Sequence, residues 1–208
     1  MKTIICTMPM RPSEELKYVQ YPVDENKAIE YEKPVLFPIN GILAKKINKS
    51  ESVKIIFIMT KSANSECEKN KVLFIKELEE INTKINANLS FDTVYMEYKA
   101  TKQIYNKLLT DLTEKISPQA EIYADITFGS KPEILSLFCA FRFIDEFKDA
   151  IIQYIVYGKV EFNKKTKGVE NPMIYDLTSL YHLFKILGMM NTVDINMGSK
   201  LLKNFFAL

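Results

Sequence analysis

The chain has 208 residues, of which 47% are hydrophobic and 26% are charged, and its formal net charge is +2. This is ordinary globular composition, long enough for one domain with a real core. A charge so close to zero argues against a broad, sequence-independent nucleic-acid surface, but not against one local basic pocket. No apolar run reaches the roughly 18–20 residues that span a bilayer, and the N-terminus lacks the layout of a signal peptide. We therefore expect a cytoplasmic protein with no membrane partner.

Short apolar runs alternate with segments of helical spacing along most of the chain. Strands are predicted over residues 2–8, 53–59, 89–98, 120–126, 150–157 and 172–175, and a basic hairpin or loop over 160–168. Helices are predicted over 36–47, from about 65 to 86, over 101–116, from 132 to about 147, and over 177–190 and 197–208. Residues 14–34 are polar, rich in Tyr and without helical period, which indicates a long functional loop.

Strands that alternate with helices imply βαβ units and a mainly parallel sheet covered on both faces. The fold class that we predict is therefore α/β, a single Rossmann-like domain. In such sheets ligands bind beyond the carboxyl ends of the strands, and three of these ends carry hydroxyl or basic side chains. The three clusters are Thr7, Met8, Pro9, Met10, Arg11 and Ser13; Thr60, Lys61, Ser62 and Asn64; and Thr127, Phe128, Gly129, Ser130 and Lys131. Together they predict a pocket for a polyanion, with separate solvated loops as the alternative.

The third cluster is the most informative, because it joins a buried strand directly to a helix. Pro132 suits the first turn of that helix, and the apolar residues that follow have helical spacing. The free N–H groups and positive end of a helix start, together with the charge of Lys131, predict an anion site. An ordinary strand-to-helix turn with a solvated lysine is the alternative.

Other chemistries are disfavoured by what the sequence does not contain. It has no Gly-x-Gly-x-x-Gly after the first strand, no Gly-x-x-x-x-Gly-Lys-Ser/Thr, no HExxH and no nucleophile elbow. The cysteines Cys6, Cys67 and Cys139 are scattered, which indicates buried thiols in a reducing compartment. Asp125 and Asp176 lie near strand ends, where they are more typical of residues that cap turns or helices than of metal ligands. No metal and no cofactor is expected.

The turn at Asp125–Lys131 resembles the signature of the CRISPR-associated Rossmann-fold (CARF) domains of type III CRISPR systems. It matches the branch with an Asp-hydrophobic-Thr-x-Gly turn. Two more segments match in order: Tyr157-Gly158 at the end of the next strand, and Tyr175-Asp176-Leu177-Thr178 at the start of a helix. The resemblance covers essentially the whole chain. Phe128 stands where many members have Gly or His, and Ser130 replaces Thr, so the size of the ligand remains open.

The resemblance implies a homodimer whose twofold pocket binds cyclic tetra- or hexa-adenylate, a second messenger of antiviral defence. Arg11, Ser13 and the loop over 14–34 are then expected to cover the ring, with base stacking from Tyr18 or Tyr21. CARF domains usually carry an effector, and residues 177–208 are too few to form one. The chain is thus either a free-standing CARF protein or the sensor domain of a longer effector. No long nucleic acid is implied as a partner.

Two enzyme hypotheses stand beside this sensor. Some CARF domains cleave their ligand without a metal, by attack of the ribose 2′-OH on the adjoining phosphate. In such a ring nuclease Lys131 is the candidate donor to the developing charge, and Ser130 and Ser13 position the ligand. The other hypothesis is a Rossmann-like transferase that binds a nucleotide cofactor such as S-adenosylmethionine, which the lack of a Gly-rich first turn disfavours.

Overall fold

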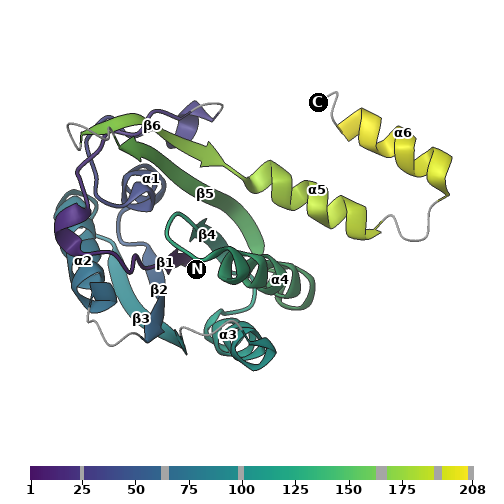
Figure 1. The fold of residues 1–208 in the computed structure, drawn as a ribbon, viewed down its shortest axis with the longest axis horizontal. Helices are drawn as coiled ribbons and strands as arrows, with labels where there is room; N and C mark the ends of the chain where they lie inside the picture. Colours follow the sequence, from purple (N-terminus) through teal and green to yellow (C-terminus); the bar gives the residue numbers. More distant parts are fainter. Residues whose placement is uncertain (24–25, 62–65, 98–100, 163–167, 190–193, 206–208) are drawn as a thin grey trace.

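Six apolar runs form the strands of one sheet, and helices cover both of its faces (Figure 1). A computed structural model describes residues 1–23, 26–61, 66–97, 101–162, 168–189 and 194–205. The strands are β1 (Lys2–Thr7), β2 (Ser52–Lys61), β3 (Asn88–Glu97), β4 (Glu121–Asp125), β5 (Ile151–Phe162) and β6 (Val169–Asp176). The helices are α1 (Pro38–Lys46), α2 (Glu66–Ile85), α3 (Lys102–Lys115), α4 (Lys131–Lys148), α5 (Thr178–Met189) and α6 (Ile195–Phe205), with short 3₁₀ turns η1 (Ser13–Glu15) and η2 (Lys27–Ile29).

The strand order in the sheet is β3-β2-β1-β4-β5-β6. All neighbouring strands are parallel except β5 and β6, which are antiparallel. The chain first moves outward from β1 to β3 and then returns to the other side of β1 with β4. The order therefore reverses between β1 and β4, which makes this pair the topological switch point of a doubly wound sheet. The prediction of a Rossmann-like, mainly parallel sheet is confirmed.

The central strands contain consecutive apolar residues because both faces of the sheet are buried. Ile4 and Ile5, consecutive residues of β1, are both completely buried and point to opposite faces. Ile4 belongs to the core on the face covered by α1 and α2, which includes Phe74. Ile5 belongs to the core beneath α3 and α4, which includes Leu137. Helices on both faces account for the lack of polar alternation in the sequence of these strands.

The hairpin of β5 and β6 is longer than the sequence predicts. Gly158 does not end β5, because the ladder continues through Gly158 opposite Ile174 and on to Phe162 opposite Val169. The rings of Tyr157 and Tyr175 also stack across the hairpin, with centroids 6.4 Å apart. The predicted boundary at residue 157 is therefore wrong, and residues 163–167, at the tip of the predicted basic hairpin, lie outside the described residues.

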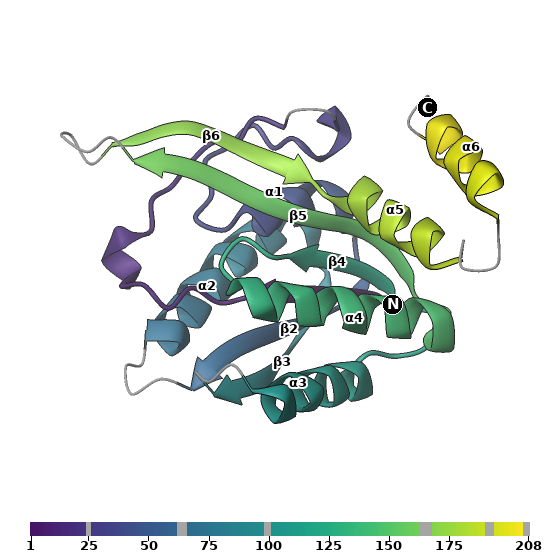
Figure 2. The same ribbon diagram turned by 45° about the vertical axis from the view of Figure 1, so that its right-hand side comes forward.

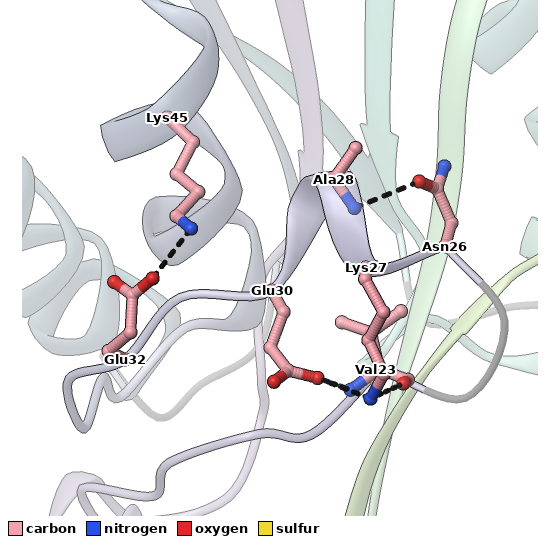
Figure 3. A network of polar contacts seen from close by, with 7 residues as sticks. All are labelled: Val23, Asn26, Lys27, Ala28, Glu30, Glu32 and Lys45. Atoms are coloured by element: carbon pink, nitrogen blue, oxygen red, sulfur yellow. Dashed lines mark hydrogen bonds and ion pairs between the residues drawn. The ribbon is translucent and has the colours of Figure 1, made fainter.

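The polar segment between η1 and α1 is packed against the body rather than open. Val19 bridges Val35, and Val23 bridges Ile174 alongside β6. Figure 3 shows polar contacts that hold this segment, in which the Lys27 ammonium donates to the carboxylate of Glu30 and to the carbonyl of Val23. Buried apolar side chains within it, such as that of Ile29, fix it further.

The last two helices extend the molecule beyond the sheet. α5 follows β6 directly, and α6 lies beyond it, apart from the strands (Figures 1 and 2). Asp176 accepts hydrogen bonds from the N–H and hydroxyl of Thr178, so its predicted capping role is confirmed. Among the described residues, no helix is both long and apolar enough to cross a membrane.

The close approach of β5 to α1 gives a direct test of the fold. A Cβ atom at Gly158 would lie 2.4 Å from Cγ of Pro38, a ring that cannot turn away. Gly158→Ala is therefore expected to lower the free energy of unfolding by about 1–3 kcal/mol. A Cβ atom at Gly188 in α5 would have no atom within 4 Å. Gly188→Ala should therefore raise the free energy of unfolding by up to about 1 kcal/mol. Urea unfolding of both variants measures the difference, and equal stabilities would contradict the packing.

Candidate functional site

The carboxyl ends of β1 and β4 meet at the switch point. Figure 2 shows the arrowheads of β2 and β5 directed to the side on which the purple turn of η1 lies and α4 begins. The Thr7 hydroxyl at the end of β1 donates to the carbonyl of Asp125 at 3.3 Å and accepts from the N–H of Phe128 at 3.3 Å. The first and third predicted clusters are therefore brought together by the fold.

Asp125 and Thr127 build the turn that follows β4. The carboxylate of Asp125, 3% exposed, accepts from the N–H of Thr127 at 2.8 Å. Burial raises the pKa of this carboxyl to about 6, although hydrogen bonds from Thr127 and from the N–H of Ile39 oppose the rise. The hydroxyl of Thr127 in turn accepts from the N–H of Gly158 on β5 at 2.8 Å. The Asp-Ile-Thr part of the motif thus ties β4 to β5, and the predicted capping role of Asp125 is confirmed.

The start of α4 is closed by a capping box. Ser130 Oγ accepts from the N–H of Glu133 at 3.4 Å, and the Glu133 carboxylate accepts from the N–H of Ser130 at 3.2 Å. This pair was not predicted, although the Ser-x-x-Glu spacing of residues 130–133 is the capping-box pattern. The expectation of free N–H groups at this helix start is therefore not met for Ser130 and Glu133, and a carboxylate already lies at the positive end of the helix.

Glu133 is the least compensated charge of the site. The residue is only 5% exposed, and within the described residues its carboxylate forms no ion pair with a lysine or arginine. Burial raises the pKa of its carboxyl to about 7, and the bonds with Ser130 only partly offset this rise. Burial raises the pKa of the Cys67 thiol in α2, and the nearby charge of Glu133 adds to this rise. Near neutral pH, the protonation state of Glu133 therefore determines the charge at the start of α4.

Two N–H groups and two cations at the turn are left for a ligand. In the part of the chain that the structure describes, the N–H groups of Gly129 and Lys131 have no acceptor, unlike those of Thr127, Phe128 and Ser130. The Lys131 side chain is exposed and unpaired among these residues. Arg11, on the segment that follows β1, has its guanidinium 5.2 Å from the centroid of the Phe128 ring.

A buried amide holds the segment that carries Arg11. The Nδ2 atom of Asn70 in α2 donates to the carbonyls of Pro9, at 2.9 Å, and Arg11, at 3.0 Å. Met8 and Pro9 are themselves buried, whereas Met10 is 38% exposed. Of the first cluster, the side chains of Met10 and Arg11 are thus the ones best placed to reach a ligand.

The remaining predicted residues lie away from the turn. Thr60 and Lys61 pair with Met96 and Glu97 of β3, on the far side of β2 from β1. Ser62 and Asn64 lie outside the described residues. Ser13 begins η1, and its carbonyl accepts from the N–H of Leu16 at 3.1 Å within that turn. The second cluster is therefore not assembled with the other two by the described contacts.

The aromatic residues expected to stack on a base prove to have different environments. Tyr21 is only 7% exposed, and burial raises the pKa of its hydroxyl to about 12, so its ring is part of the core. Tyr18 is 63% exposed but lines a separate hollow of about 190 Å³ together with Tyr31 and residues of α2. The expectation of stacking on Tyr21 is wrong, because the alternating apolar residues around it draw the segment into the core.

A hollow of about 410 Å³ lies next to Arg11 and was not predicted. It is lined by Arg11, Glu14, Glu15, Lys17 and Phe162. A narrower cleft joins the same region to the turn, because Arg11, Glu15 and Phe162 also line it together with Thr127, Phe128 and Gly158. Phe162 was missed because β5 was expected to end at Tyr157. The available signal was the alternation of Gly158, Val160 and Phe162 along one face of the strand.

Comparison with known proteins adds no assignment to this geometry. The sequence matches no protein-family model and no curated protein. The site is accordingly interpreted from its own chemistry.

The buried carboxyl of Glu133 predicts a pH-dependent stability. Its pKa is about 7 in the folded chain against a usual value of 4.5, so the folded state holds a proton that the unfolded state releases between these values. Relative to Glu133→Gln, the wild type should therefore lose roughly 2–4 kcal/mol of unfolding free energy as the pH rises from 4.5 to 8. Asp125 titrates in both proteins and cancels in the difference.

Chemical unfolding at several pH values measures this difference. Glu114→Gln is the control, because it makes the same Glu-to-Gln change at an exposed carboxyl of α3. Parallel pH profiles for the wild type and Glu133→Gln would contradict the uncompensated burial of this carboxyl.

Proposed function

We propose that the chain is a CARF-type sensor that binds a cyclic oligoadenylate of four or six adenylates in type III CRISPR defence in the cytoplasm. The observation that carries the proposal is the arrangement at the switch point. There, the N–H groups of Gly129 and Lys131 have no acceptor among the described residues, the Lys131 side chain is exposed, and the guanidinium of Arg11 lies over the ring of Phe128 in the same turn. The ordered resemblance of the turn, Tyr157-Gly158 and the segment Tyr175–Thr178 to CARF motifs names the ligand class.

The chemistry of a cyclic RNA suits this arrangement. Each phosphate of the ring carries one negative charge and oxygen atoms that accept hydrogen bonds from backbone N–H groups at a helix start. Lys131 and Arg11 supply charge from two different segments, which favours an extended anion over a single phosphate. Protonation of Glu133 removes a negative charge at the start of α4, so phosphate binding and proton uptake at Glu133 support each other.

A homodimer is part of the same proposal. A twofold-symmetric ring is naturally bound at an isologous interface, where both copies present the same residues. The outer faces of α4 and α5 leave large apolar side chains in solvent, among them Phe147 at 72% and Leu180 at 53% exposure. Phe143 and Phe184 on the same two helices are also exposed. Such a surface supports an interface, because apolar patches of this kind on soluble proteins commonly mark one.

Calorimetric titration with rings of three to six adenylates tests the proposal. We expect one ring size to bind with one ring for two chains. Lys131→Ala should weaken binding about 10- to 100-fold, because it removes a charged hydrogen bond to a phosphate.

Lys102→Ala provides a matched control. Lys102 is also the exposed first residue of a helix, α3, but that helix does not start at the switch point. The proposal is wrong if no ring binds, or if the Lys131 and Lys102 variants bind a ring equally well.

Ring cleavage is the second candidate function, and the exposed, unpaired ammonium of Lys131 favours it. Incubation with labelled cyclic tetra- and hexa-adenylate in EDTA should then give linear products with 2′,3′-cyclic phosphate ends. Lys131→Ala should abolish them, because the developing charge on the phosphate loses its donor. Ser13→Ala should retain activity, since the described hydrogen bond of Ser13 is made by its backbone within η1. Intact rings after incubation with the wild type would leave a sensor without this activity.

A further inference from the structure

The hollow beside Arg11 differs in charge from the turn at residues 127–131. Among the described residues, its lining contains two basic residues, Arg11 and Lys17, and two acidic ones, Glu14 and Glu15. The Lys17 ammonium is engaged with the carbonyl of Glu14 at 3.0 Å, so its charge is directed to η1. A phosphate placed here would meet two exposed carboxylates, whereas an uncharged group would not. The charge distribution therefore favours a neutral part of a ligand in the hollow and the phosphates at the turn.

The hollow also offers flat surfaces. Phe162, the last residue of β5, lines the hollow and is 43% exposed, although it is a large apolar residue. Arg11 adds a planar guanidinium, which already lies on the ring of Phe128. Nucleic-acid bases stack on phenylalanine rings and on guanidinium planes, with little dependence on sequence. A volume of about 410 Å³ is within the range of small-molecule pockets and exceeds the space that one base requires.

The acidic lining distinguishes between bases. Glu15 lines both the hollow and the cleft that leads to the turn, together with Phe162 in each case, whereas Glu14 lines the hollow alone. A carboxylate only accepts hydrogen bonds, so it suits an exocyclic amine such as N6 of adenine. It repels the oxygen that replaces this amine in hypoxanthine.

We propose that this hollow is a base site, in which an adenine stacks on Phe162 and donates its exocyclic amine to Glu15. The inference rests on the proposed binding of a cyclic oligoadenylate and adds the residues that select its base. In the homodimer each chain provides one such site. The phosphate next to this adenine then lies toward Arg11 and the turn, along the cleft that connects the two.

The test compares cyclic oligoadenylate with the ring of the same size that contains inosine in place of adenosine. The wild type should bind the adenylate ring at least about 10-fold more tightly. Glu15→Gln should bring the two affinities close together, because an amide both accepts from the amine of adenine and donates to the oxygen of hypoxanthine. Equal affinities for the two rings in the wild type would overturn the proposal.

Phe162 is tested by its effect on both rings. Phe162→Ala should weaken each ring about 5- to 100-fold through lost stacking, and Phe162→Tyr should restore binding. Phe91→Ala is the control, because Phe91 is comparably exposed, at 37%, but lies on β3. Thermal unfolding of each variant checks that the fold is kept.

The outcomes separate this inference from the proposed function. Ring binding that depends on Lys131 but not on Phe162 or Glu15 overturns the base site and leaves the sensor. Absence of binding to any ring overturns both.

Discussion

The site depends on one requirement, that the polar groups buried where β1 and β4 end must be hydrogen-bonded. The hydroxyl of Thr7 satisfies a carbonyl and an N–H of the neighbouring turn, and the carboxylate of Asp125 satisfies the N–H of Thr127. The hydroxyl of Thr127 extends these hydrogen bonds to β5, because it accepts from the N–H of Gly158. Three strands are thereby fixed relative to one another at the point where the order of the sheet reverses. A ligand at this corner meets a rigid backbone rather than a free loop.

Charge at this corner is balanced rather than simply positive. Lys131 is exposed and Arg11 is half-buried against Phe128, whereas Glu133 is buried and forms no ion pair among the described residues. The helix start that attracts an anion also stabilises this carboxylate, so the two compete for the same field. A buried carboxyl with a pKa near neutrality is sensitive to any new charge nearby. The attraction of this corner for an anion thus depends on the protonation state of Glu133 as well as on the number of lysines.

The sequence was sufficient for the fold because buried parallel strands are continuous apolar runs. It also placed the turn at residues 127–131 and the capping roles of Asp125 and Asp176. It failed where contacts join distant segments. The bond between Thr7 and Phe128 and the burial of Tyr21 depend on packing that no local pattern specifies. Phe162 was missed for a different reason, since Gly158 was treated as a strand end although it remains in the ladder.

The pairing of Val23 with Ile174 has a consequence for the borders of the sheet. The N–H of Ile174 donates to the carbonyl of Pro22, so the outer edge of β6 is already occupied along part of its length. The opposite border is β3, the terminal strand in the described order. Asp92 of this strand forms ion pairs with Lys54 and Lys115, so charged groups lie along that edge of the sheet. Addition of a strand from another molecule is thus hindered along part of β6 by the chain's own backbone and disfavoured at β3 by charge.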